Sequence, residues 1–143
     1  MNQEIKRLCQ KADQFNRLRI QSAQVLMNEE EINVFQTFPL LFHFNHPTLP
    51  GYISDDVPSG IALYETTEHH KNLLRNFLQV ELPTKTSSNN DLLGLYAMGS
   101  TSSVGQSSES DFDIWICYPH QLASERITLL NEKAWAITHW ASN

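Results

Sequence analysis

The chain has 143 residues, of which 41% are hydrophobic and 18% are charged, and its formal net charge is −6 at pH 7. This length and balance fit one globular domain with a reasonable core and exclude a largely disordered chain. The negative charge argues against a template-directed polymerase or another protein that grips nucleic acid, because such binding depends on clustered Lys and Arg.

Two helices are predicted at the start of the chain. The first has apolar residues at helical spacing and should run to about Met27; they are Ile5, Leu8, Ala12 and Phe15. Asn28 and the three glutamates after it have the pattern of an N-cap and an acidic first turn, which predicts a second helix. Pro39 is expected to kink or end this second helix.

An apolar cluster follows within and after the second helix: Phe38, Leu40, Leu41, Phe42 and Phe44. We expect it to pack against a sheet, although a patch for a membrane or a partner is an alternative. From His46 to Gly60 the chain is rich in Pro and Gly, which predicts an irregular connection. The acid pair Asp55-Asp56 within it is expected to be solvated.

A short helix is predicted from Glu68 to Leu78, with Thr67 as its cap, and a polar loop from Pro83 to Asn90. After the strands described next, apolar residues at spacings of three and four predict an amphipathic helix from Leu122 to Trp140. Trp135 and Trp140 are expected in the core or at a domain interface.

The strongest pattern lies between the loop and that last helix. An apolar strand ends at Gly99-Ser100, a serine-rich turn follows, and a second strand opens with Asp111 and Asp113. Side chains alternate along a strand, so the two carboxylates should share one face and Phe112 should point to the other. Neighbouring carboxylates repel unless a cation lies between them, and their oxygens suit Mg²⁺. The pair therefore predicts half of a magnesium site.

The turn before the two acids suits phosphate binding. A glycine at a strand end lets a ligand approach the backbone, and the polar run after it offers N–H groups and hydroxyls to phosphate oxygens. The candidate substrate-binding residues are Gly99, Ser100, Thr101, Ser102, Ser103, Gln106, Ser107 and Ser110. No Lys or Arg lies between Thr86 and Arg126, so the positive charge must come from metal, backbone dipoles or distant basic residues.

Other kinds of site have less support. The histidines His43, His46, His69 and His70 come without a cysteine or a third ligand, and zinc normally takes at least three protein ligands. We expect them to be surface groups or ordinary hydrogen-bonding partners. A serine hydrolase is not supported, because the serine-rich turn lacks the Gly-x-Ser-x-Gly pattern.

The cysteines and the apolar runs bear on the compartment of the protein and on membrane insertion. Cys9 and Cys117 are the two cysteines, so we expect no disulfide framework and a reducing, cytoplasmic setting. No apolar run approaches the length of a membrane span, and the first residues do not resemble a signal peptide. We therefore expect no transmembrane segment.

The Gly-Ser pair with an Asp-x-Asp twelve residues after the glycine resembles the nucleotidyltransferase superfamily, which includes DNA polymerase beta. The eighteen residues from Met98 to Trp115 are similar to the catalytic signature of the bacterial class I adenylate cyclases. The wider superfamily often has a basic residue and a glycine where this chain has Ser103-Val104, which favours the cyclases. The segments 50–54 and 60–64 also resemble the amino-terminal region of that family.

This resemblance implies an α+β, DNA polymerase beta-like nucleotidyltransferase fold, with a small mixed sheet flanked by helices. Residues 1–90 would form a helical amino-terminal region packed on the catalytic core, and residues 91–143 the start of that core. The implied activity converts ATP to 3′,5′-cyclic AMP and pyrophosphate by a two-metal mechanism, with Asp111 and Asp113 holding Mg²⁺ or Mn²⁺. The family is also associated with regulation by the sugar phosphotransferase system through a carboxy-terminal region.

Such enzymes use a third carboxylate from a later strand, and the acids after Asp113 are Glu125 and Glu132, both inside the last predicted helix. We therefore expect a fragment, or an unusually short relative, with little or no turnover alone. Two alternatives stay open: a nucleotidyltransferase that acts on a separate acceptor, and a catalytically silent nucleotide-binding module.

Overall fold

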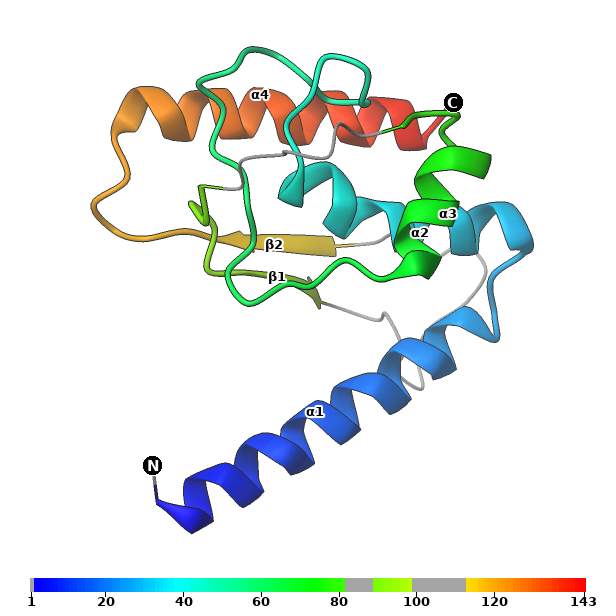
Figure 1. Cartoon of the computed structure of the whole chain (residues 1–143), viewed down its shortest axis with the longest axis vertical. Coiled ribbons are helices and arrows are strands. Elements are labelled where there is room, and N and C mark those ends of the chain that lie inside the picture. Colours follow the sequence, from blue (N-terminus) through cyan, green and yellow to red (C-terminus); the bar gives the residue numbers. More distant parts are fainter. Residues whose placement is uncertain (1, 82–88, 99–112) are drawn as a thin grey trace. The chain divides into compact units, whose positions relative to one another are not determined.

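The computed structural model describes residues 2–81, 89–98 and 113–143. Its elements are α1 (Gln3–Gln24), α2 (Glu29–His43), α3 (Glu68–Asn76), β1 (Gly94–Met98), β2 (Asp113–Cys117) and α4 (Ser124–Ala141), as shown in Figure 1. The chain divides into two compact units, one of Met1–Ile32 with Ala97–Ile114 and one of Asn33–Tyr96 with Trp115–Asn143. The nucleotidyltransferase fold and the domain division at residue 91 stay predictions.

Helix α1 confirms the first predicted helix. The side-chain Oδ1 of Asn2 accepts a hydrogen bond from the Glu4 N–H at 3.1 Å and caps the helix start. The helix ends at Gln24, three residues before the expected end at Met27. Its larger apolar side chains are about half exposed or more, among them Ile5, Leu8, Phe15 and Leu18. The helix therefore adds little to the buried core.

Helix α2 begins at the predicted cap. The Glu31 N–H donates to Asn28 Oδ1 at 3.0 Å, and the Asn28 N–H donates to Glu31 Oε2 at 2.8 Å, which is a reciprocal capping box. Of the two alternatives for Pro39, the end of the helix is wrong, because α2 continues to His43, and the kink stays a prediction. A proline costs about 3 kcal/mol inside a helix. Leu40 and Leu41, which directly follow Pro39, are fully buried, and burial of each side chain contributes about 1.5–3 kcal/mol of stability, which offsets this cost.

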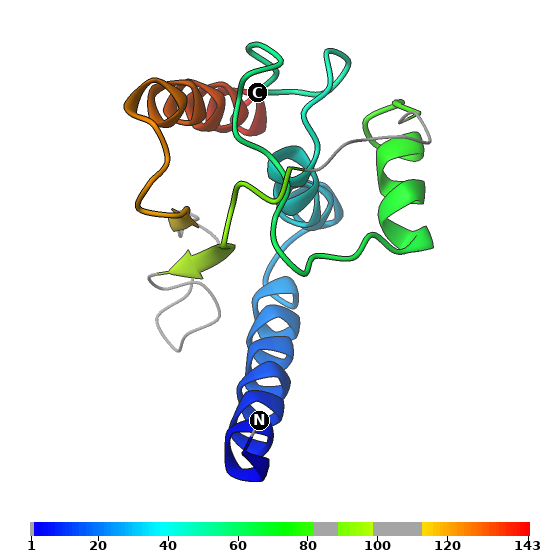
Figure 2. The same cartoon turned by 60° about the vertical axis from the view of Figure 1, so that its left-hand side comes forward.

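The core of the larger unit is built around α2. The predicted apolar cluster is buried, so the alternative of an exposed patch for a membrane or a partner is wrong. Side chains from other segments join this core: Leu49, Val57, Ile61, Leu73, Leu74, Leu92, Leu130 and Ile137. Figure 2 shows α2 between α3 and α4. Hydrogen bonds from His69 to Gln36 and from Lys133 to the Phe44 carbonyl agree with this arrangement.

The predicted connection and the short helix α3 are also confirmed. No helix or named strand lies between His43 and Glu68. The connection returns to α2 where the Gly60 N–H donates to the Phe42 carbonyl at 3.3 Å. Thr67 caps α3, and its N–H donates to His70 Nδ1 at 3.1 Å while its hydroxyl accepts from the His70 N–H. The histidine takes the place that Glu or Gln usually has in a capping box.

The described sheet has two strands, β1 and β2, and Figure 1 draws their arrows in opposite directions. The Leu93 N–H donates to the Cys117 carbonyl at 2.7 Å where β1 starts and β2 ends. On the side of β1 away from β2, Leu92 forms a parallel bridge to Ile61. The two cysteines are free, as expected, and no helix in the described part of the chain is long and apolar enough to cross a membrane.

Helix α4 confirms the last predicted helix and carries a buried lysine. Lys133 lies in line with the buried Leu130 and Ile137, and its Nζ donates to the Phe44 carbonyl at 3.2 Å and to Asn45 Oδ1 at 3.1 Å. These acceptors directly follow the end of α2, where a positive charge is favourable. Burial lowers the pKa of Lys133 to about 8.

The two tryptophans of α4 differ from each other. Trp140 is partly buried, and its ring meets Phe77 edge-on at 6.2 Å between ring centroids. Trp135 is 75% exposed, so the core alternative is wrong for this residue, and the domain-interface alternative stays a prediction. It lies two residues after Lys133 and therefore faces the side of α4 away from the buried Leu130 and Ile137.

Replacing Lys133 by Met should give a stability difference that depends on pH. The folded state binds the lysine proton less tightly than the unfolded state, so wild-type stability should rise relative to Lys133→Met between pH 8 and 10.5. The gain should be at most about 3 kcal/mol. Urea unfolding of both proteins at pH 7 and pH 10 measures it. The exposed Lys71→Met is the control, and an equal change in both variants would contradict the assignment.

Candidate active site

The structure places one of the predicted site residues. Asp113 is the first residue of β2, and its side chain is exposed. The other candidates lie outside the described residues: Gly99, Ser100, Thr101, Ser102, Ser103, Gln106, Ser107, Ser110 and Asp111. The described chain stops at Met98, the last residue of β1, and resumes at Asp113. The predicted site is therefore attached to the sheet at both of its ends.

The two attachment points lie at one edge of the sheet. Because β1 and β2 run in opposite directions, the end of β1 is next to the start of β2 (Figure 1). Along β2, Asp113 and Trp115 are exposed, while Ile114 and Ile116 are half-buried. This alternation is the one expected for a carboxylate on the solvent face and apolar side chains on the other face.

The described carboxylate has the chemistry that a magnesium ion needs. Asp113 makes no ion pair with any residue that the structure describes, and its exposed oxygens are hard ligands of the kind that Mg²⁺ takes. Residues 2–81, 89–98 and 113–143 contain no cluster of three or more His, Cys, Asp or Glu that could hold a metal. Further ligands would have to come from outside these ranges.

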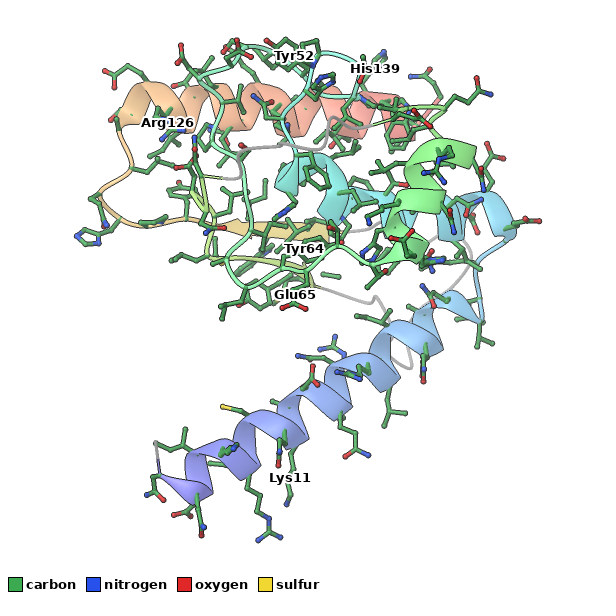
Figure 3. All side chains as sticks on the ribbon, in the orientation of Figure 1. Lys11, Tyr52, Tyr64, Glu65, Arg126 and His139 are labelled. Atoms are coloured by element: carbon green, nitrogen blue, oxygen red, sulfur yellow. The ribbon has the colours of Figure 1, made fainter. Side chains whose placement is uncertain are left out.

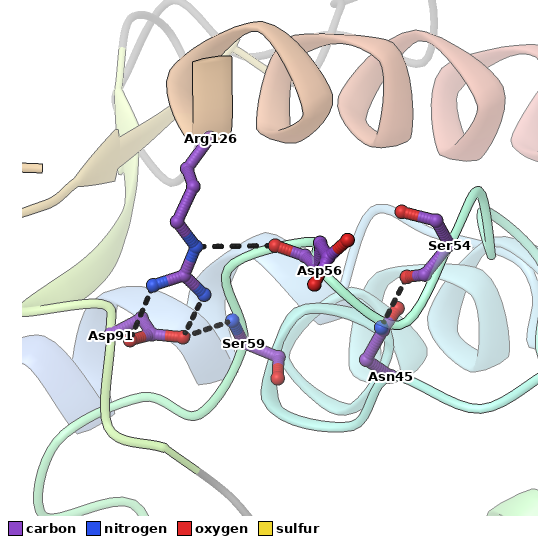
Figure 4. Close-up of polar contacts among 6 residues, drawn as sticks. All are labelled: Asn45, Ser54, Asp56, Ser59, Asp91 and Arg126. Carbon is purple, nitrogen blue, oxygen red and sulfur yellow. Dashed lines mark hydrogen bonds and ion pairs between the residues drawn. The ribbon is translucent and has the colours of Figure 1, made fainter. Parts of the chain in front are cut away.

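A charged network lies just before β1 (Figure 4). Arg126 in the first turn of α4 binds Asp91 through two parallel contacts, Nη1 to Oδ1 at 3.3 Å and Nη2 to Oδ2 at 2.8 Å. Arg126 Nε also donates to the Asp56 carbonyl at 3.2 Å, and Asp91 Oδ2 accepts the Ser59 N–H at 3.1 Å. The network therefore ties the connection, the entry to β1 and the start of α4 together.

Comparison with known proteins identifies the family. The model of the adenylate cyclase NT domain matches residues 4–143. The chain belongs to this family. Adenylate cyclase of Escherichia coli (strain K12) is 39% identical over 142 residues, which cover 97% of this chain and 17% of that protein. Adenylate cyclase of Salmonella typhimurium is 38% identical, again over 97% of this chain and 17% of that protein. Adenylate cyclase of Proteus mirabilis is 35% identical over 96% of this chain and 16% of that protein.

The match confirms the resemblance drawn from residues 98–115 at the level of the family. The chain spans about a sixth of the length of the curated relatives that it matches. No solved structure matches it.

Two groups in this adenylate cyclase NT domain were not predicted from sequence. Asp91 and Arg126 are 35 positions apart, and neither belongs to a recognisable motif, so nothing in the sequence pairs them. Lys133 did leave a signal, because it occupies a position of the apolar stripe between Leu130 and Ile137. Figure 3 labels Arg126 at the amino-terminal end of α4.

The histidines make ordinary hydrogen bonds, as predicted. His43 Nδ1 accepts the Ile61 N–H at 3.1 Å, His69 Nε2 contacts Gln36 Oε1 at 2.9 Å, and His46 Nδ1 contacts the Thr48 hydroxyl at 2.7 Å. Burial lowers the pKa of His43 and is also the main cause that lowers the pKa of His70. In both residues Nδ1 accepts a backbone N–H, so both are unprotonated at that atom.

The ring of Tyr64, labelled in Figure 3, lies beside both of these histidines. Its hydroxyl is buried and makes no hydrogen bond to any residue that the structure describes. Burial raises the pKa of Tyr64 to about 12, so the phenol stays neutral at physiological pH. These rings form a packed aromatic group, and their arrangement gives no metal site.

Replacing His43 by Asn should weaken the acid sensitivity of the domain. The folded pKa of His43 lies below its ordinary value of 6.5, so stability is lost as pH falls from about 6.5 through the folded pKa. The amide oxygen of Asn can accept the Ile61 N–H without titrating. Thermal unfolding at pH 7.5 and pH 5 should show a smaller drop in melting temperature for His43→Asn than for the wild type. The exposed His139→Asn is the control, and equal losses in wild type and His43→Asn would refute this role.

Proposed function

We propose that this chain is the amino-terminal, catalytic part of an adenylate cyclase that converts ATP to 3′,5′-cyclic AMP and pyrophosphate. The observation that carries the proposal is the family match over residues 4–143, which includes the whole predicted phosphate and metal motif. The two strands that hold this motif meet at one edge of the sheet, which supports the proposal. A nucleotidyltransferase fold for the complete catalytic core is part of it.

In this proposal Asp111 and Asp113 hold Mg²⁺ or Mn²⁺ through their carboxylate oxygens. A bound divalent ion of this kind lowers the pKa of a coordinated hydroxyl and neutralises charge on a triphosphate. The backbone N–H groups and hydroxyls of the turn after Gly99 contact the phosphate oxygens of ATP. The exposure of Asp113 at the start of β2 is consistent with this role.

The proposed reaction takes place within one ATP molecule. The ribose 3′-oxygen forms a bond to the α-phosphorus, the bond from that phosphorus to the pyrophosphate oxygen breaks, and the hydroxyl proton passes to solvent. Because nucleophile and electrophile belong to the same substrate, the site acts chiefly by holding them in line, which supplies several kcal/mol of the acceleration, on the order of 7 or more in favourable cases.

The proposal concerns the protein at its full natural length. The curated relatives named adenylate cyclase are about six times longer than the part matched by this chain. We propose that the third carboxylate comes from the remaining length, that the 143 residues alone turn over little ATP, and that the sugar phosphotransferase system regulates the complete enzyme. A transferase with a separate acceptor or a silent nucleotide-binding module would give a different product pattern.

Replacing Asp113 by Asn should abolish cyclase activity without unfolding the domain. The exposed Asp113 side chain supports no core contact, so circular dichroism and melting temperature should stay unchanged while kcat falls by about a thousandfold or more. The assay is formation of cyclic AMP from ATP by the full-length protein with Mg²⁺. Glu65→Gln, an exposed acid in the connection before α3, is the matched control.

Three outcomes of the same assay distinguish the alternatives. Cyclic AMP supports the proposal, adenylylated acceptor supports a transferase, and bound but unreacted ATP supports a silent module. Wild-type activity in Asp113→Asn would refute the metal role of this carboxylate.

A further inference from the structure

The contact between Asp91 and Arg126 pairs opposite charges and also fixes the orientation of the Asp91 carboxylate. Each terminal nitrogen of the guanidinium meets one carboxylate oxygen, Nη1 to Oδ1 at 3.3 Å and Nη2 to Oδ2 at 2.8 Å, so the contact is bidentate and restricts how the carboxylate can be oriented. Side-chain exposure is 15% for Asp91 and 33% for Arg126, so water screens the pair only in part. A lysine could supply the same charge but only one point of contact.

Each partner is also held from a second side (Figure 4). The Ser59 N–H donates to Asp91 Oδ2, and the third guanidinium donor, Nε, reaches the Asp56 carbonyl. The loop that supplies these groups is itself fastened, because Asn45 Nδ2 donates to the Ser54 carbonyl at 2.8 Å. The side chain of Asp91 therefore has its direction set from the connection and from α4 at once.

The backbone of Asp91 starts the hydrogen bonds that lead into β1. The N–H groups of Asp91 and Leu92 donate to the carbonyls of Ser59 and Gly60, both at 3.0 Å. The next residue, Leu93, donates to Cys117 at the end of β2. Because the sheet in the described part of the chain has two strands of five residues each, these first contacts contribute strongly to its register. A slip of one residue would turn the side chains of β1 to the opposite face of the sheet and change which of them lie beside β2.

We propose that Asp91 and Arg126 are positioning residues for the cyclase reaction, acting through the register of β1 against β2. The inference rests on the proposed function, because the acid that β2 carries, Asp113, is the one to which that function assigns the metal. Arg126 is committed to Asp91 and is not a free phosphate ligand. The pair does not touch substrate; it sets the register in which the chain enters β1 beside the end of β2.

The test uses the full-length protein and the variant Arg126→Lys, which keeps the charge and removes the fork. Misplacement of reacting groups by about 1 Å costs up to a hundredfold in rate, so kcat should fall by about tenfold or more. The Mg²⁺ concentration for half-maximal activity should rise by about threefold or more, because the metal-binding acid is displaced. KM for ATP should change less than kcat.

Two further variants sharpen the comparison. Asp91→Asn keeps an oxygen for the Ser59 N–H and loses the ion pair, and it should show the same pattern. Arg75→Lys is the matched control, because Arg75 pairs with Glu81 at 3.5 Å on an exposed surface. A merely structural role lowers kcat only in proportion to the folded fraction and leaves the Mg²⁺ dependence unchanged. That result, or wild-type kinetics in Arg126→Lys, would overturn the inference.

Amide hydrogen exchange separates this inference from the proposed function. Arg126→Lys should speed exchange at the Leu92 and Leu93 N–H groups and leave the middle of α4 protected. If wild type makes no cyclic AMP, the proposed function fails, whereas unchanged exchange at these two amides overturns the positioning role by itself.

Discussion

The arrangement of the larger unit depends on Asp91, which lies just before β1, because three segments far apart in the sequence are joined at this residue. The fork of Arg126 fixes the carboxylate, and the carboxylate accepts a backbone N–H of the connection. Paired charges that are partly removed from water are not in general more stabilising than apolar contacts. What the pair adds here is a fixed orientation, since a bidentate guanidinium contact accepts one orientation of the carboxylate while an apolar contact accepts many.

Lys133 gives a second example of a polar group that fixes the arrangement of helices. Its ammonium group reaches the chain directly after α2, so α4 is held to the end of α2 as well as to the connection. The neighbouring apolar side chains supply the hydrophobic stabilisation of this interface, and the lysine supplies its alignment. Burial of the ammonium carries a cost that appears as its lowered pKa.

Local patterns in the sequence predicted the helices well, because caps and apolar spacing act within a few residues. Asn28, Thr67 and the stripe of α4 belong to this class, and so does the motif that indicated the family. The choice between a kink and an end at Pro39 could not be made locally, since continuation of α2 depends on burial among distant segments. The Asp91–Arg126 contact was unpredictable for the same reason, and the metal-binding and phosphate-binding roles stay predictions.

The exposure of two of the three tryptophans has an optical consequence. Trp115 on β2 and Trp135 on α4 are 61% and 75% exposed, whereas Trp140 packs against Phe77. Indole emission shifts to longer wavelength in water, so the intrinsic fluorescence of the domain is dominated by two solvated emitters. Trp115 belongs to the strand that begins with Asp113, so the emission of this indole reports on the surroundings of that strand.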